Sequence, residues 1–380
     1  MEKESSKKIS NQKRFIFVII TISLPVLFFI ILELMLWIAV PSLDHTIVSE
    51  VSYDNIEWYQ INRGYLKDYF PINAHLIPEF KPSLFKKEKN PELFRVFCLG
   101  GSSMFGTPYQ MTSNIPGIVR RQLRQLFPDR EIEVINFGAS AINSHVIKQF
   151  AGELLQFQPD LILIYMGHNE FYGPDGVGAT YLEKKVSFLI SLKYQLRKVR
   201  TYKLMRRWIE SSIFPKTPLP EKNLMRDVSQ GSEIQLNSAD AKRVFRDFRN
   251  NLEDIIDIFQ KNKIPVIVSD VTSNLLFQPF SYAKEIHELQ IDQLLEQSSN
   301  ESHNEKDFWE LYKKDSTHAL VNYWLGKYYL EEQKLNKARY HLSLARDGDL
   351  LKFRAPSRIN QIIEKVCKKS KVPFISSDAY

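Results

Sequence analysis

The longest apolar stretch of the chain lies close to its N-terminus. Residues 15–40 read FIFVIITISLPVLFFIILELMLWIAV and contain one charged residue, Glu33. At ~1.5 Å of rise per residue, this helix would be about 39 Å long, more than the roughly 30 Å hydrocarbon core of a bilayer. A signal peptide has a shorter apolar core followed by a small-residue cleavage site. The pattern therefore predicts an uncleaved transmembrane anchor.

Charge before the anchor predicts its orientation. The tail, residues 1–14, contains five basic residues and two acidic ones. By the positive-inside rule this tail stays in the cytoplasm, and everything after Val40 lies on the outer, periplasmic or extracellular side. Two interpretations of Glu33 are open. In one, its carboxylate pairs with a partner helix inside the membrane. In the other, which we favour, Glu33 lies near the outer interface and its carboxylate reaches water.

Beyond the anchor, short apolar runs alternate with amphipathic segments. The runs that predict strands are 94–99, 131–136, 160–165, 264–270 and 372–375. The segments that predict helices are 118–127, 141–157 and 239–261. Such alternation indicates a parallel sheet with helices on both faces.

Other segments divide the chain further. Residues 41–90 form a lead-in rich in Tyr, Phe, Pro and Lys, which we expect to be irregular and packed on the main domain. The α/β domain spans 91–304, with a basic insertion at 176–238, and ends with 348–380. Residues 305–347 read as purely helical, with small and apolar residues near the spacing of one tetratricopeptide-like repeat. A lone repeat cannot bury its own face, so we expect this helical insertion to pack on the main domain.

Composition excludes several classes of protein. The 380 residues are 44% hydrophobic and 25% charged, which excludes global disorder. Two cysteines exclude a disulfide scaffold, and we expect Cys98 and Cys367 to be buried free thiols. The net charge of +7 is modest and comes partly from the N-terminal tail, so we expect no nucleic-acid partner. No pair of histidines has zinc spacing, so we predict no metal, and nothing indicates another cofactor.

Three turns follow three of the predicted strands. They read GGSSMFG (100–106), NFGAS (136–140) and GHNEFYG (167–173). Sites form at the carboxyl ends of parallel strands, so these turns should share one edge of the sheet. The first turn is not a G-x-S-x-G elbow, because Met104 replaces the last Gly, and no Lys follows Gly106 as in a phosphate-binding loop. Each turn alone is ordinary, but three in this order are specific.

Together the three turns resemble those of the SGNH (GDSL-like) hydrolase family. The resemblance covers residues 60–380 and is strongest to a membrane-anchored bacterial branch with a tetratricopeptide-like insertion. It implies an α/β fold with a three-layer, flavodoxin-like parallel sheet, and esterase activity. It further implies that Ser102 is the nucleophile, with Gly101 in place of the usual Asp. The oxyanion hole would comprise the Ser102 and Gly138 N–H groups and the Asn169 amide, where one donor is worth about 2.7–4 kcal/mol.

The base that a serine nucleophile needs is missing from its expected place. The family keeps it in an Asp-x-x-His block after the last strand, whereas this sequence ends at Tyr380 directly after that strand. Either the chain is truncated, or the base comes from elsewhere, or the protein is not a hydrolase. Asp315 and His318 form an Asp-x-x-His, but at a predicted helix start, where a cap is the better reading. His168, beside Asn169, is a further weak candidate.

Two more residues have alternative readings. Asn274 follows the fourth strand on the same edge and either contacts substrate or caps a turn. Arg354 binds either a substrate carboxylate or a structural Asp, and we favour the Asp.

The leading hypothesis is a membrane-anchored, outward-facing serine esterase that acts on acylated glycans or lipids at the cell envelope. An O-acyltransferase of envelope glycans is an alternative within the same chemistry. A truncated or inactive membrane-tethered binding or scaffold protein is an alternative of another class, with a protein partner at the helical insertion.

Overall fold

The computed structural model describes residues 11–40, 46–70, 77–109, 111–178, 187–197, 199–213, 233–282 and 305–377. The chain forms two compact units. Residues 1–45 and 188–217 make the first, and residues 46–187 and 218–380 make the second. The middle of the predicted basic insertion thus groups with the N-terminal helix.

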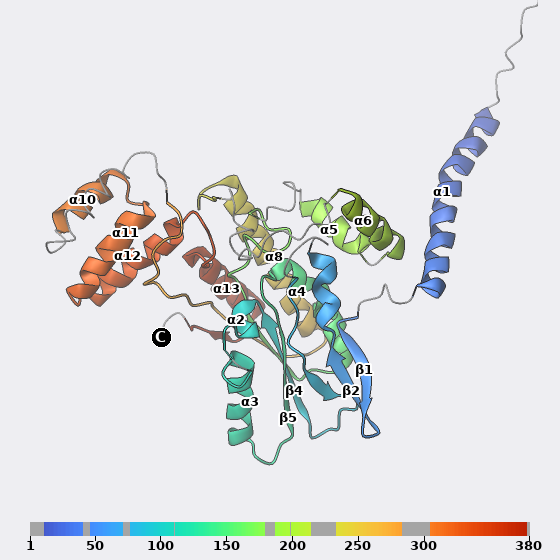
Figure 1. Cartoon of the computed structure of the whole chain (residues 1–380), viewed down its shortest axis with the longest axis horizontal. Helices are drawn as coiled ribbons and strands as arrows, with labels where there is room; N and C mark the ends of the chain where they lie inside the picture. The colour runs from blue at the N-terminus through green and yellow to red at the C-terminus, as the bar shows by residue number, and fades with distance from the viewer. Residues whose placement is uncertain are drawn as a thin grey trace, which may run out of the picture. The chain divides into compact units, whose positions relative to one another are not determined.

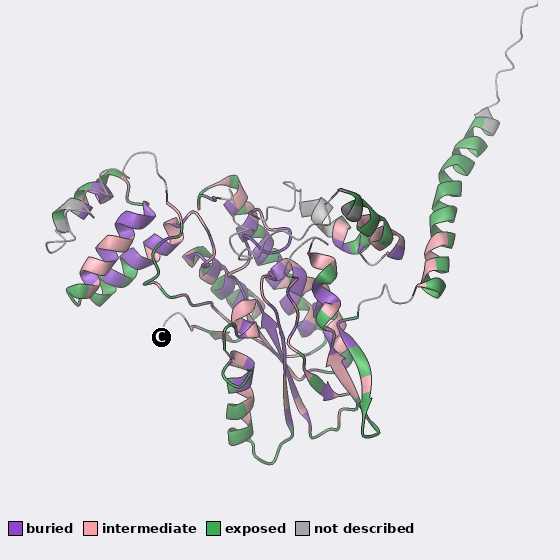
Figure 2. Cartoon of the chain, viewed as in Figure 1, coloured by how far each residue is buried: buried purple, intermediate pink, exposed green. Residues whose placement is uncertain are grey.

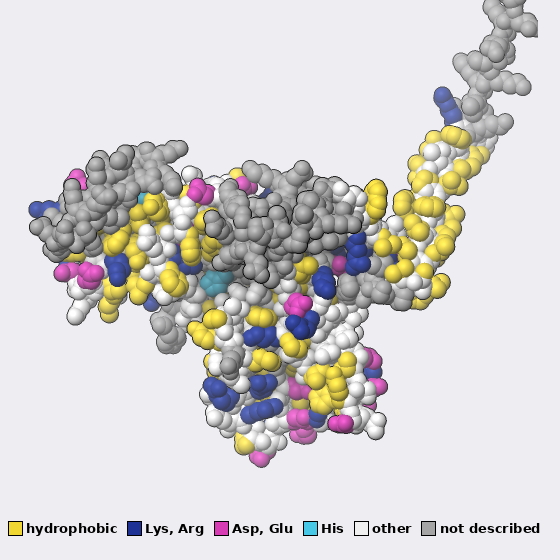
Figure 3. Space-filling model, viewed as in Figure 1, with side chains coloured by type: hydrophobic (Ala, Val, Ile, Leu, Met, Phe, Trp, Pro, Cys, Tyr) yellow, Lys and Arg dark blue, Asp and Glu magenta, His cyan; other side chains and the backbone are white. Residues whose placement is uncertain are grey.

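The first unit is helical. It contains α1 (Asn11–Ala39), α5 (Ser187–Leu196) and α6 (Arg200–Ile213). Residues 14–39 of α1 are long and apolar enough to cross a membrane by length and composition, and their most apolar window is entirely unburied. Hydrophobic side chains cover α1 (Figure 3), and most of it is exposed (Figure 2). The predicted apolar helix is therefore present, and its insertion in a membrane stays a prediction.

The second unit is built on a five-stranded parallel sheet (Figure 1). Its strands are β4 (Phe94–Gly100), β5 (Ile132–Gly138), β6 (Leu161–Tyr165), β7 (Val266–Ser269) and β8 (Phe374–Ile375). They lie in the order β5-β4-β6-β7-β8, and every neighbouring pair is parallel. Counted along the chain this is the order 2-1-3-4-5 of flavodoxin-like doubly wound sheets. The five predicted strands are confirmed to within a few residues.

Helices cover both faces of the sheet. One face packs on α4 (Ser144–Ala151), α8 (Ala239–Lys261) and α13 (Ser357–Ser370), whose apolar residues join Phe97 and Leu99 of β4 in one buried cluster. The alternate residues Val96 and Cys98 face α3 (Ile115–Leu126). This alternation follows from the two-residue period of a strand. Cys98 and Cys367 are free and buried, as predicted.

Helix bounds follow their local caps. The α8 helix begins at the predicted residue, because the Ser238 side chain accepts a hydrogen bond from the Ala241 N–H. The α4 helix is shorter than the predicted 141–157. Its Asn143 cap accepts from the Val146 N–H, and the chain after α4 tightens into a 3₁₀ helix, η3 (Gly152–Phe157).

The lead-in is not irregular, contrary to expectation. It contains an antiparallel sheet of β1 (Val48–Tyr53), β2 (Ile56–Ile61) and β3 (Leu84–Lys86), and a 3₁₀ helix, η2 (Arg63–Tyr69). Asp54 and Asn55 both have positive φ, 52° and 62°, which suits a tight two-residue hairpin between β1 and β2. The Asp-Asn pair between two half-apolar runs was the sequence signal for this hairpin.

The helical insertion contains α10 (Glu305–Lys314), α11 (Ala319–Glu331) and α12 (Leu335–Gly348). The α11 and α12 helices pack closely at Gly326, where an added Cβ would lie 2.6 Å from Leu342 Cγ. The insertion has a small core of its own, which includes Phe308 and Leu325. The predicted helices are confirmed, and their kinship with tetratricopeptide repeats stays a prediction.

Candidate active site

Ser102 begins the short helix α2 (Ser102–Phe105), and one residue, Gly101, separates it from the end of β4. β4 ends at Gly100, which is in register with Gly138 of β5 and Tyr165 of β6. A Cβ on Gly100 would lie 2.1 Å from the Tyr165 carbonyl oxygen, so only glycine fits this turn. Ser102 itself is half-buried and therefore reaches the surface of this edge.

The Asn169 side chain lies beside this turn. A Cβ on Gly101 would be 2.7 Å from Asn169 Nδ2, and Gly101 directly precedes Ser102. Asn169 Nδ2 also donates to the Ile142 carbonyl at 2.9 Å, which fixes the amide between the turns after β4 and β5. A carboxamide nitrogen has two N–H groups, so one remains for a second acceptor. The structure thus brings Ser102 and Asn169 together.

Gly138 lies at the expected edge of the sheet, but its N–H differs from the expectation. Its N–H donates to Asn136 Oδ1 at 2.8 Å and is therefore already paired. A Cβ on Gly138 would lie 2.6 Å from the Phe105 backbone nitrogen. The glycine lets β5 approach α2 closely, and this role, rather than a free N–H for an oxyanion, is what the geometry supports. The Asn136 side chain, two residues earlier, is the competitor that the sequence pattern did not reveal.

His168 is held by backbone groups. Its Nδ1 accepts the Ala355 N–H at 3.2 Å, so the ring proton is on Nε2. Burial lowers the pKa of His168 to about 4, although a hydrogen bond with the Thr272 backbone opposes this shift. Both ring nitrogens are therefore engaged with backbone groups of other loops, which leaves His168 no lone pair with which to take a proton from Ser102.

Asp315 and His318 form a helix start. Asp315 Oδ1 accepts hydrogen bonds from the Thr317 N–H at 2.8 Å and from the Thr317 hydroxyl at 2.7 Å. His318 is the N-cap of α11, where its Nδ1 accepts the Val321 N–H at 3.3 Å. These contacts match the capping interpretation of this Asp-x-x-His.

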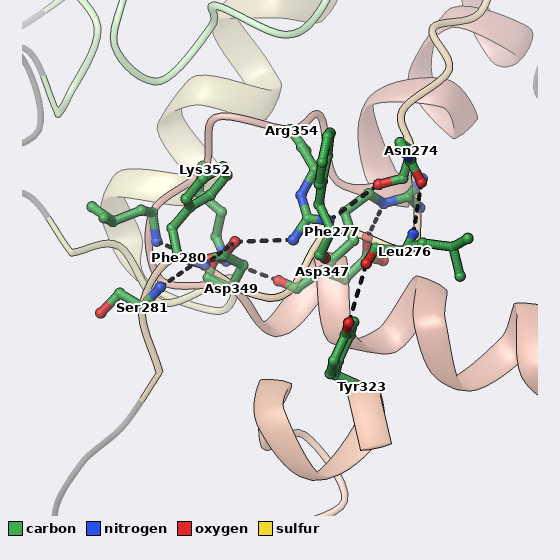
Figure 4. A network of polar contacts seen from close by, with 12 residues as sticks. Asn274, Leu276, Phe277, Phe280, Ser281, Tyr323, Asp347, Asp349, Lys352 and Arg354 are labelled. Carbon is green, nitrogen blue, oxygen red and sulfur yellow. Dashed lines mark hydrogen bonds and ion pairs between the residues drawn. The ribbon is translucent and has the colours of Figure 1, made fainter. Parts of the chain in front are cut away.

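Asn274 and Arg354 belong to a polar network between the loop after β7 and the loop after α12 (Figure 4). Asn274 is exposed, and its Oδ1 accepts the Leu276 N–H at 2.9 Å, which closes a turn. Arg354 donates to the Phe277 carbonyl at 2.7 Å and forms an ion pair with Asp349 at 3.2 Å. The reading of Arg354 as the partner of a structural Asp is confirmed.

The buried residue Lys352 completes this network (Figure 4). Its Nζ donates to the Asp347 carbonyl at 2.8 Å and also to the Asp349 carbonyl. Burial lowers the pKa of Lys352 to about 8, although the two aspartates raise it. Lys352 therefore holds two backbone carbonyls of this loop together.

Glu170 belongs to the third turn of the resemblance, and the sequence analysis gave it no role of its own. Glu170 is 3% exposed, and its carboxylate accepts the Ser144 N–H at 3.0 Å and the Ser144 hydroxyl at 2.6 Å. Asn251 of α8 donates to the same hydroxyl at 3.1 Å. Burial raises the pKa of Glu170 to about 7, although the Ser144 bonds lower it. Glu170 therefore ties the Asn169 turn to the start of α4, and its signal in the sequence was an acidic residue directly before the apolar pair Phe171 and Tyr172.

The chain after β8 stays on the same edge of the sheet. Asp270, at the end of β7, is 4% exposed and accepts the Ser377 N–H at 2.6 Å and the Ser376 hydroxyl at 3.1 Å. Residues 378–380 lie outside the described residues. Within the described part of the chain, no group of three or more His, Cys, Asp or Glu side chains is placed to hold a metal ion.

No family model matches this sequence, and no curated protein does either. Among solved structures, the chain is similar to AlinE4, described as an SGNH-hydrolase family esterase, and to two single-substitution mutants of that esterase. Identity is 15% and the TM-score is 0.27, over 49% of this chain and 63% of that one. This chain thus spans less than two thirds of the esterase. A superposition at this level by itself supports no assignment of activity.

Proposed function

We propose that this protein is a membrane-anchored, outward-facing serine esterase of the SGNH type, with Ser102 as the nucleophile. The observation that supports this proposal most is the placement of Ser102 at the start of a helix, beside the Asn169 amide. The Gly101 Cβ position lies 2.7 Å from Asn169 Nδ2. A serine and a fixed amide beside it are two of the parts that acyl transfer needs, and a base is the third.

The chemistry would run as follows. Ser102 Oγ attacks the ester carbonyl and forms a bond to its carbon, while the hydroxyl proton goes to a base. The negative carbonyl oxygen binds the Ser102 N–H, which has no intrahelical partner at the first position of α2, and the second N–H of Asn169. Collapse breaks the ester C–O bond, and the leaving alkoxide takes the proton from the base. Water then releases the acyl group from Ser102.

The base of this proposal is not one of the four histidines that the structure describes. The four described histidines each make contacts of another kind. His168 and His318 accept backbone N–H groups, His341 Nδ1 contacts Asn322 Oδ1 at 2.9 Å, and His145 Nδ1 contacts Asn251 Nδ2 at 3.1 Å. An acylated glycan or lipid of the envelope is the proposed substrate, from location alone, and transfer to a glycan hydroxyl would use the same site.

A second candidate function is a non-catalytic, membrane-tethered binding or scaffold protein. The engagement of every described histidine favours it, because a serine without a base turns over slowly. The helical insertion would then be the partner-binding part.

Ester hydrolysis separates the two functions. We expect the purified full chain to hydrolyse p-nitrophenyl acetate, Ser102→Ala to abolish this activity, and Ser103→Ala to preserve it. Asn169→Ala should lower kcat by about 10²–10³-fold, the usual effect of losing one oxyanion donor. Equal activity of the wild type and Ser102→Ala would refute the proposed function, and a wild type without activity would favour the scaffold.

A further inference from the structure

Glu33 of α1 finds its partners within the first unit. Its Oε1 accepts the Arg200 N–H at 2.7 Å, and its Oε2 accepts the Thr201 N–H at 2.9 Å and the Thr201 hydroxyl at 2.8 Å. Neither sequence-based reading of Glu33 anticipated this, because the partner is a helix of the same chain.

These contacts cap a helix. Arg200 and Thr201 are the first residues of α6, where backbone N–H groups have no intrahelical acceptor. A carboxylate there satisfies those donors and interacts favourably with the positive end of the helix dipole. The only acidic residue of the apolar span thus fixes the start of α6 against α1.

The position of Glu33 shows where along α1 the first residues of α6 are held. Glu33 lies six residues before the last residue of α1, Ala39. At about 1.5 Å per residue, the junction is ~9 Å from the end of the helix. If α1 spans the bilayer, α6 begins at the boundary between acyl chains and headgroups.

The α6 sequence suits that boundary. RTYKLMRRWIESSI contains four basic residues and one acidic residue. Its apolar side chains fall on one face and are exposed: Leu204 37%, Met205 50%, Trp208 70% and Ile209 37%. The basic residues Arg200, Lys203, Arg206 and Arg207 fall on the opposite face at 100° per residue. A basic amphipathic helix with Trp on its apolar face is the kind that lies in a membrane interface.

We propose that α6 lies flat on the membrane that α1 crosses, with Leu204, Met205 and Trp208 among the acyl chains. Its basic residues that reach the surface, Lys203, Arg206 and Arg207, would lie at anionic lipid headgroups, whereas Arg200 is buried. This inference rests on the proposed membrane anchor and is independent of the esterase chemistry. The α6 helix would then be a second membrane contact of the chain beside the anchor, and Glu33 would hold its first residues against α1.

Spin labels on the full-length chain in vesicles test this. Ser212 is exposed and falls on the apolar face of α6, and Lys203 falls on the basic face. The native thiols are buried, so Ser212→Cys and Lys203→Cys can each be labelled selectively. We expect the label at 212 to lie about 5–10 Å below the headgroup phosphates, accessible to oxygen, and the label at 203 to be accessible to a water-soluble nickel reagent.

Lipid composition and two further variants complete the test. In phosphatidylcholine vesicles that contain phosphatidylglycerol, the label at 212 should lie deeper than in phosphatidylcholine alone. Adding the Glu33→Ala substitution should increase the mobility of the spin label at position 212, because the start of α6 then loses its hydrogen bonds to α1. A label on Ile19→Cys reports the anchor separately. If position 19 is in lipid while position 212 stays in water, or is shielded from both lipid and water, the interfacial helix is refuted. If position 19 is in water, the anchor itself fails.

Discussion

Gly100 ends β4 at a point where no side chain fits. A Cβ there would meet the Tyr165 carbonyl at 2.1 Å and Met104 Cβ at 2.6 Å, and the first of these is rigid backbone. We expect Gly100→Ala to destabilise the second unit by about 1–3 kcal/mol, the usual cost of overpacking. It should also displace Ser102. Urea unfolding of the full chain, followed by far-UV circular dichroism, measures the loss.

Gly152 provides the matched control. No atom lies within 4 Å of a Cβ added there, so Gly152→Ala should leave stability unchanged or slightly raised. Equal stability of the two alanine variants would mean that the turn before Ser102 is not as tight as described.

Glu170 makes stability depend on pH. Its pKa rises from 4.5 in the unfolded chain to about 7 in the folded one, because the carboxyl is buried. The folded state therefore binds a proton more tightly, and the free energy of unfolding should fall as pH rises from about 4.5 to 7. The slope is up to about 1.4 kcal/mol per pH unit.

The Glu170→Gln variant has no such proton to lose. We expect its free energy of unfolding, measured by urea at several pH values between 5 and 8, to lack this slope. Parallel profiles for the wild type and the variant would show that Glu170 is not the group concerned.

In the second unit, the Asp349 carboxylate joins the loop after β7 to the loop after α12. Asp349 is 1% exposed and accepts the Phe280 N–H at 3.0 Å, the Ser281 N–H at 3.1 Å and the Leu351 N–H at 3.1 Å, besides its ion pair with Arg354 (Figure 4). Removing such a charge leaves several buried donors without a strong acceptor. We expect Asp349→Asn to cost about 1.5–3 kcal/mol of stability.

Amide hydrogen exchange locates that effect. The amides of Phe280 and Ser281 should exchange faster in Asp349→Asn, while the exposed control Asp129→Asn should change neither exchange nor stability. Unchanged exchange at both amides would contradict the interpretation that Asp349 joins these two loops.

Periodic elements were the predictable part of this fold. The α8 helix was foreseen from Ala239 to Lys261, because its apolar spacing and its Ser238 cap agree. The order of the turns placed Ser102 and Asn169 on one edge, because parallel strands end together. Two features depend on contacts distant in sequence, and no single sequence shows such contacts. They are the backbone hydrogen bond of His168 with Ala355 and the Glu33 cap of α6. The pairing of Gly138 with Asn136 is local, but the sequence pattern does not show that the Asn136 side chain turns back onto this N–H.

At the scale of the whole molecule, the chain combines an apolar N-terminal helical unit with an α/β unit that carries the candidate site. The Glu33 cap belongs to the first unit and the Ser102–Asn169 pair to the second. Proposed anchoring and proposed chemistry therefore rest on separate residues and can fail separately.

Covalent labelling tests the proposed nucleophile most directly, because it needs neither the natural substrate nor a complete catalytic cycle. The full chain is treated with a fluorophosphonate probe, and the modified peptide is identified by mass spectrometry. We predict modification at Ser102, no labelling of Ser102→Ala, and slower labelling of Asn169→Ala. Labelling that persists in Ser102→Ala, or that maps to another residue, would contradict the account.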